Sequence, residues 1–212
     1  MSEDKKTSPT IVKGEIVINI KQKEWIKKLE AASGKPVEFN RPQGVAYLVI
    51  DCSESMRGDN LEYAKNGSRG FAEEAQKKGY LVGLIQFGSE PKHLLDPQRD
   101  IVNFHSDVER LKIDGSTNMA AAILMAKDRL GNGKERVICL VTDGEPDDRK
   151  ATLIAAKEAK SMGIDIMTIG TDDADKTFLE ELATRKELSL KIVRTQLQQG
   201  ITSMAKMLSG KT

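Results

Sequence analysis

From residue 45 onward, short apolar segments alternate with segments of helical periodicity. The apolar segments span residues 45–50, 81–87, 137–142, 164–169 and 188–193, and most are nearly continuous runs of apolar side chains. A strand with so few polar positions is buried on both faces, which is typical of a parallel sheet. Parallel strands need crossover connections, so helices cover both faces of such a sheet. We therefore expect an α/β fold with a doubly wound, mostly parallel, Rossmann-like sheet.

The segments between these strands carry the expected helices. Apolar residues recur at three- and four-residue spacing within residues 61–75, 119–130, 153–162, 178–183 and 197–208. Ser106–Glu109 and Thr195–Gln198 fit the capping box, which predicts a helix start at each. The segment 92–95, which follows Pro91, predicts one short antiparallel edge strand.

Residues 1–39 differ from the rest and predict a strand–helix extension, with the main domain over residues 40–212. Ile16, Ile18 and Ile20 alternate with polar neighbours, as in a strand with one buried face. An amphipathic helix is expected around Trp25, and we expect the extension to pack on the main sheet or its edge. The lysines of this helix form either a solvated face or a surface for an acidic partner; they are Lys21, Lys23, Lys27 and Lys28.

Composition favours a cytosolic protein without affinity for nucleic acid or membranes. Lys and Arg number 33 against 32 Asp and Glu, so the net charge of +1 supplies no attractive field for polyanions. No apolar stretch approaches the ~20 residues of a membrane span, and the first residues lack the apolar stretch of a secretory signal. Both cysteines, Cys52 and Cys139, lie in or beside apolar strands and are expected to be reduced core residues.

Oxygen-bearing side chains follow two of the expected strands. Asp51 ends the most hydrophobic run of the chain, and Ser53 and Ser55 follow it at alternate positions. Asp143 follows the third run in the same way. In an open α/β sheet, ligands bind beyond the carboxyl ends of the strands, where the winding direction reverses. If these two strands are neighbours, the two carboxylates face each other, and a divalent cation between them relieves their repulsion.

A third segment, 114–119, adds Thr117 near the start of an expected helix. The candidate metal ligands contain oxygen alone, and His93 and His105 stand apart in sequence as surface or capping groups. Hard oxygen donors with few charges favour Mg²⁺ or Mn²⁺, with Ca²⁺ as a further option, and argue against zinc. The candidate ligands are Asp51, Ser53, Ser55, Thr117 and Asp143.

Three segments together resemble the metal-ion-dependent adhesion site (MIDAS) of von Willebrand factor A domains. They are DCSES (51–55), GSTNMAAAI (115–123) and LVTDGEPDD (140–148), and the likeness extends over residues 40–212. The resemblance implies an intact MIDAS whose ion keeps one coordination position open for a Glu or Asp of a protein partner. It also implies an adaptor or scaffold, not an enzyme, working in a complex that can include an ATPase. A shift of the last helix, residues 197–208, on ligand binding is a further implication.

The chain departs from the family pattern at two positions. Glu54 and Ser116 stand where the family often has glycine, and neither change removes a ligand. Glu54 and Glu145 place additional negative charge near the site. Each glutamate can repel an acidic ligand, occupy the open coordination position, or point into solvent.

Other interpretations of these residues compete with a metal-dependent binding module. The aspartates can be strand-end caps and the serines simple turn residues. A strand that ends in aspartate also resembles Mg²⁺-dependent phosphatases of the haloacid dehalogenase type. Those enzymes need a second aspartate two positions later as the general acid, and Ser53 cannot serve in that role near neutral pH. No glycine-rich nucleotide-binding motif follows any strand.

Overall fold

A six-stranded sheet forms the centre of the protein. The computed structural model describes residues 10–12, 15–17, 20–34, 42–133, 135–171 and 173–209. The strand order is β5-β4-β3-β6-β7-β8, and only β5 runs antiparallel to its neighbour. The strands are β3 (Gly44–Asp51), β4 (Tyr80–Phe87), β5 (Lys92–Gln98), β6 (Glu135–Thr142), β7 (Asp165–Gly170) and β8 (Ser189–Lys191). The expected doubly wound α/β fold and its antiparallel edge strand are confirmed.

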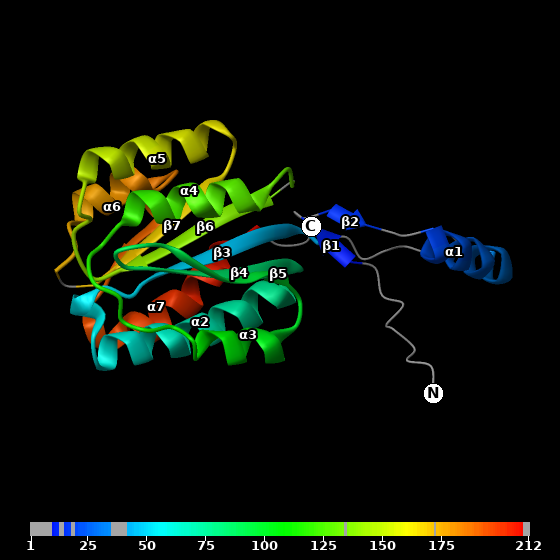
Figure 1. Ribbon diagram of the computed structural model, residues 1–212, viewed down its shortest axis with the longest axis horizontal. Coiled ribbons are helices and arrows are strands. Elements are labelled where there is room, and N and C mark those ends of the chain that lie inside the picture. The colour runs from blue at the N-terminus through cyan, green and yellow to red at the C-terminus, as the bar shows by residue number, and fades with distance from the viewer. Residues whose placement is uncertain are drawn as a thin grey trace.

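Helices cover both faces of this sheet (Figure 1). One layer contains α2 (Asp59–Lys77), α3 (Ile101–Val108) and α7 (Leu197–Met204), and the other contains α4 (Met119–Leu130), α5 (Arg149–Ser161) and α6 (Lys176–Leu182). Short 3₁₀ turns η1 (Glu54–Met56), η2 (Lys186–Leu188), η3 (Arg194–Gln196) and η4 (Ala205–Met207) complete the connections. None of the described helices combines the length and apolar character that crossing a bilayer requires.

The central strand β3 shows why the apolar runs become sheet. All eight of its residues are buried. Alternate side chains enter the two separate cores: Leu48 and Ile50 pack on the side of α2 and α7, and Tyr47 and Val49 on the side of α4 and α5. Fully burying each large apolar side chain contributes roughly 1.5–3 kcal/mol, so a strand buried on both faces stabilises both layers at once.

The N-terminal extension differs from what the alternating isoleucines suggest. Strands β1 (Thr10–Val12) and β2 (Glu15–Val17) pair antiparallel with each other in a sheet of their own. Ile20 begins helix α1 (Ile20–Ser33) instead of continuing a strand, and Ile18 lies outside the described residues. Trp25 of α1 is 56% exposed. The extension adds no described strand to the main sheet, and its packing on that sheet stays a prediction.

The capping-box prediction at Ser106 is wrong, and the one at Thr195 places a helix start one residue before the observed one. Helix α3 begins after Asp100, whose carboxylate accepts the backbone N–H groups of Val102 and Asn103 at 3.0 and 3.2 Å, so the segment 106–109 forms the end of that helix. Helix α7 begins after Gln196, without a side-chain cap. For α3 the reason is that Asp100 alone satisfies two free amides at the helix start, so no glutamate three residues later is needed.

Candidate metal site

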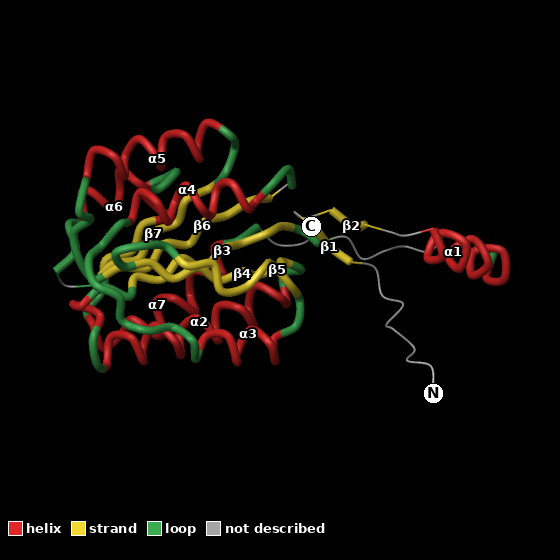
Figure 2. The backbone as a smooth tube through the Cα atoms, in the orientation of Figure 1, coloured by secondary structure: helices red, strands yellow, loops and turns green. Residues whose placement is uncertain are grey.

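The switch point of the sheet lies between β3 and β6. These two strands are parallel neighbours, with Ile50 opposite Val141, so Asp51 and Asp143 leave the sheet side by side. Figure 2 shows the loops that follow them gathered at one end of the strands. Asp51 is 0% exposed and Asp143 2% exposed. Two buried carboxylates at the ends of neighbouring strands cost free energy unless protons, hydrogen bonds or a cation compensate their charge.

Asp51 is held from two directions. The Thr142 hydroxyl donates to Oδ2 at 2.6 Å, and the Ser53 backbone N–H donates to Oδ1 at 2.8 Å. Burial nevertheless raises the pKa of the Asp51 carboxyl to about 6, and the nearby charge of Asp143 acts in the same direction. These hydrogen bonds offset only part of the desolvation, so Asp51 favours an added positive charge.

Asp143 is linked to the serines of the first loop. The Ser55 hydroxyl donates to its Oδ1 at 2.6 Å, and the Ser53 and Ser55 hydroxyl oxygens are 3.0 Å apart. Asn60, at the start of α2, donates its side-chain amide to Asp143 Oδ2 at 3.0 Å and to the Ser55 carbonyl at 3.3 Å. Four of the five sequence-predicted ligands therefore form one cluster of oxygen atoms.

Backbone contacts bring Thr117 to the same carboxyl ends of the strands. The Asp114 N–H donates to the Cys52 carbonyl at 2.7 Å, and the Glu54 N–H donates to the Gly115 carbonyl at 3.1 Å. These bonds join the loop of residues 114–118 to the loop that follows β3. Asp147 then accepts the Thr117 N–H at 3.0 Å and donates its own N–H to the Thr117 carbonyl at 3.1 Å. The half-buried Thr117 is thus placed beside the cluster, with no side-chain bond to the other four candidates among the described residues.

The two glutamates near the site are each paired with an arginine. Glu54 is 61% exposed and forms a bidentate pair with Arg57, with a closest contact of 2.7 Å. Glu145 pairs with Arg149 at 2.7 Å, and Arg149 also pairs with Asp175 at 2.6 Å. Of the alternatives for Glu54, the structure shows the exposed one, with the carboxylate directed to Arg57.

Sequence reasoning missed three residues that organise the site: Thr142, Asn60 and Asp147. Thr142 lies in the strand before Asp143, and the period-two alternation of a strand could have placed it on the face of Asp51. Asn60 and Asp147 have no such signal, because their roles depend on where α2 and the loop before α5 lie in space.

The chemistry of the cluster fits a hard divalent cation. Among the described residues, no lysine or arginine pairs with Asp51 or Asp143, so both carboxylates meet only neutral donors. The same part of the chain contains no group of three or more His, Cys, Asp or Glu side chains placed as metal ligands. Two carboxylates with several hydroxyls suit an oxygen-preferring ion whose remaining positions are filled by water or a ligand.

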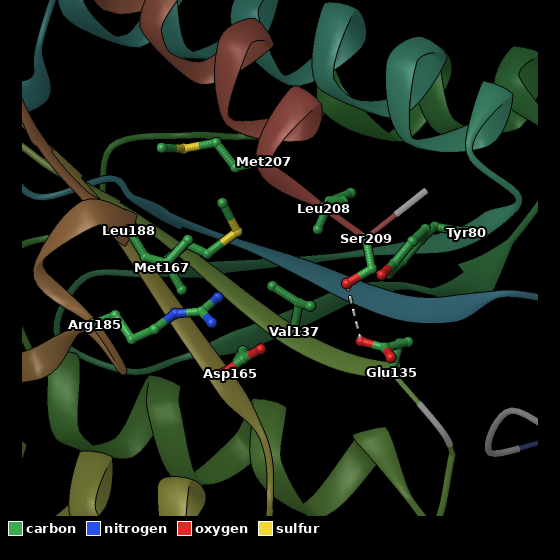
Figure 3. A pocket seen from close by; sticks show the side chains of 10 residues that line it. All are labelled: Tyr80, Glu135, Val137, Asp165, Met167, Arg185, Leu188, Met207, Leu208 and Ser209. Carbon is green, nitrogen blue, oxygen red and sulfur yellow. Dashed lines mark hydrogen bonds between the residues drawn. The ribbon is translucent and has the colours of Figure 1, made fainter. Parts of the chain in front are cut away.

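A cavity at the opposite ends of the strands offers no competing site (Figure 3). Tyr80, Glu135, Asp165 and Arg185 are among its lining residues, and Ser209 donates to Glu135 at 3.4 Å. Its volume of about 20 Å³ accommodates about one water molecule. The oxygen cluster at the carboxyl ends of the strands therefore remains the candidate functional site.

An open, mostly parallel α/β domain with an oxygen-only site at its switch point is the class of protein that this structure defines. The von Willebrand factor type A domain model matches residues 47–203. The chain therefore belongs to the von Willebrand factor type A family.

A curated relative, the UPF0353 protein of Mycobacterium sp. (strain KMS), is 29% identical over 160 residues, covering 66% of this chain and 48% of the relative. The chain thus spans about half the length of the curated relatives it matches.

Two solved structures share the fold. The von Willebrand factor domain of the type V pili tip protein Mfa5 from Porphyromonas gingivalis superposes with a TM-score of 0.69 at 15% identity, covering 79% of this chain and 97% of that one. Proximal thread matrix protein 1 from the mussel byssus, with a zinc-occupied MIDAS motif, gives a TM-score of 0.67 at 19% identity, covering 77% of this chain and 47% of that one.

Proposed function

We propose that this protein is a divalent-cation-dependent protein-binding module, and that Asp51, Ser53, Ser55, Thr117 and Asp143 hold the ion. The observation that carries the proposal is the contact of Ser55 with both Ser53 and Asp143. It joins two buried carboxylates, neither of which pairs with a described lysine or arginine, into one oxygen cluster. The family membership supports an interaction role.

The donor set accounts for capture of an acidic partner. Only two of the five candidate ligands are anionic and three are neutral hydroxyls, so a bound divalent ion would remain electrophilic and could accept a further carboxylate at an open position. A Glu or Asp of the partner would supply it. Because Glu54 and Glu145 are already paired with arginines, neither glutamate needs to compete for that position. A multi-protein complex that includes an ATPase is the partner setting that the family resemblance favours.

The identity of the ion follows from comparing the affinities of several divalent cations. The oxygen donors favour Mg²⁺ or Mn²⁺ and permit Ca²⁺. The zinc-occupied MIDAS of the mussel protein adds Zn²⁺ to the ions to be titrated.

Titration calorimetry of the full chain tests the metal site. We expect Asp51→Ala to abolish binding of Mg²⁺ or Mn²⁺ while circular dichroism shows a folded domain. Asp128→Ala is the matched control, since Asp128 lies on α4 with an exposed side chain paired to Lys127. Unchanged affinity in Asp51→Ala would refute the site.

Capture of protein partners tests the function. With the full chain immobilised, we expect specific partners retained in Mg²⁺ to be lost on chelation and to be absent with Asp51→Ala. Partners that survive both changes would show a metal-independent interface instead.

A further inference from the structure

A groove of about 230 Å³ lies at the β5 edge of the sheet. Three of its lining residues are cationic and none is acidic; the lining consists of Gln86, Lys92, Leu94, Arg110 and Lys112. A surface hollow with this lining favours anionic groups.

The groove is built on a buried amide. Gln86 is 3% exposed, and its side chain donates to the Lys112 carbonyl and accepts the Lys112 N–H, both at 3.3 Å. These two bonds fix the backbone of Lys112 against the end of β4.

The three cationic side chains of the groove differ in whether a carboxylate pairs with them. Lys92 pairs with Asp114 at 2.6 Å, and Arg110 pairs with Asp107 at 2.6 Å. The exposed Lys112 has no carboxylate partner among the described residues. The positive charge that remains for a ligand is therefore centred on Lys112.

The same chain segment borders the groove and the candidate metal site. Lys112 is followed by Asp114 and Gly115, whose backbone bonds to Cys52 and Glu54 join this segment to the loop after Asp51. Lys92 binds the Asp114 side chain and so ties the edge strand β5 to it. A ligand that extends along residues 112–117 would contact the groove at one end and the candidate metal site at the other.

We infer that the groove binds a second carboxylate of the partner segment whose first carboxylate meets the ion. This inference rests on the proposed function for the first contact. The partner is then an extended segment with several acidic side chains, and Leu94 offers an apolar contact between them. Attraction at Lys112 would select multiply acidic segments over those with a single Glu or Asp.

Two synthetic peptides test this inference on the full chain in Mg²⁺ by nuclear magnetic resonance titration: hexaglutamate, and a serine hexapeptide with one glutamate. Lys112→Glu replaces an attractive exposed charge pair by a repulsive one of similar size, so we expect it to weaken hexaglutamate binding about two- to thirtyfold. Affinities for the single-glutamate peptide and for Mg²⁺ should not change. Lys157→Glu makes the same charge change on exposed α5, in the other helix layer, and should leave all three affinities unchanged.

Each other result has a definite meaning. Equal hexaglutamate affinity in Lys112→Glu and Lys157→Glu overturns the groove and leaves the metal site standing. Failure of the metal-loaded wild type to bind hexaglutamate also overturns it. Hexaglutamate binding that resists a chelator but falls with Lys112→Glu supports the groove and rejects ion-mediated capture. Lys112→Gln, which removes charge without reversing it, should give a smaller loss of the same sign.

Discussion

At the scale of single residues, Asp51 carries the largest electrostatic cost of the site. Its carboxyl has a pKa of about 6 in the folded protein, against 3.8 ordinarily, chiefly because burial disfavours the charged form. The folded state therefore binds a proton more tightly than the unfolded state. The stabilisation from this group is fully present below pH 3.8 and is lost as the pH rises through about 6.

Asp51→Asn should therefore stabilise the metal-free protein at pH 8 by about 1–3 kcal/mol, because the amide carries no charge to bury. Thr142 can accept the new N–H and donate its hydroxyl to the Gly144 carbonyl, which already lies 3.3 Å away. Thermal unfolding in chelator at pH 5 and pH 8 measures the effect, and the advantage of the variant should shrink at pH 5.

His93 also contributes to the pH dependence of stability, so wild type and Asp51→Asn must be compared at each pH. Burial and the charge of Arg129 lower the pKa of His93, so its stabilisation is fully present above the ordinary value of 6.5 and is lost as the pH falls from there through the lowered pKa. This slope opposes that of Asp51. The difference between wild type and Asp51→Asn cancels the His93 contribution, and a difference independent of pH would contradict the role given to Asp51.

At the scale of elements, two glycines set how closely α2 approaches α7. A Cβ at Gly67 would lie 2.8 Å from Ile201 Cβ and 3.0 Å from the Gln198 carbonyl oxygen, and one at Gly70 would collide with Thr202. Lys78, just after α2, donates to the carbonyls of Lys206 and Leu208, both at 2.5 Å. The C-terminal segment is thus held against α2 at both places. The shift of this helix on ligand binding stays a prediction.

Gly67→Ala should destabilise the protein on the order of 1 kcal/mol, because overpacking costs about 1–3 kcal/mol and exceeds the gain of up to about 1 kcal/mol in helix propensity. Urea unfolding measures the change. Asn66→Ala, one residue earlier on the exposed face of α2, is the control and should be neutral or slightly stabilising. Stabilisation by Gly67→Ala would show that α7 can move away at little cost.

At the scale of the whole molecule, the N-terminal extension adds no described strand to the main sheet. Its strands β1 and β2 pair with each other, and residues of α1 are absent from both described hydrophobic cores. The extension precedes β3 at Gly44, whereas the oxygen cluster follows Asp51 at the other end of that strand. The stability of the domain and the metal site should therefore not depend on residues 1–39.

Removing residues 1–39 tests the expected domain boundary. We expect residues 40–212 to unfold in urea with a free energy within about 1 kcal/mol of the full chain, since the large apolar contacts lie beyond the boundary. Metal affinity should also be unchanged. A loss above about 2 kcal/mol would show that the extension is an integral part of the domain.

The sequence alone determined the sheet, because a strand buried on both faces must be apolar along its length, as residues 45–50 are. It also determined which three loops carry oxygen donors, since those residues immediately follow strand ends or precede a helix. Only the tertiary structure decided that Asn60 and Thr142 orient the two aspartates, that Glu54 and Glu145 turn to arginines, and that Asp100 starts α3. The Asn60–Asp143 and Thr142–Asp51 hydrogen bonds join residues far apart in the chain, so no local pattern encodes them. The partners of Glu54, Glu145 and Asp100 are close in sequence, but each carboxylate has several possible partners and only the folded chain selects one.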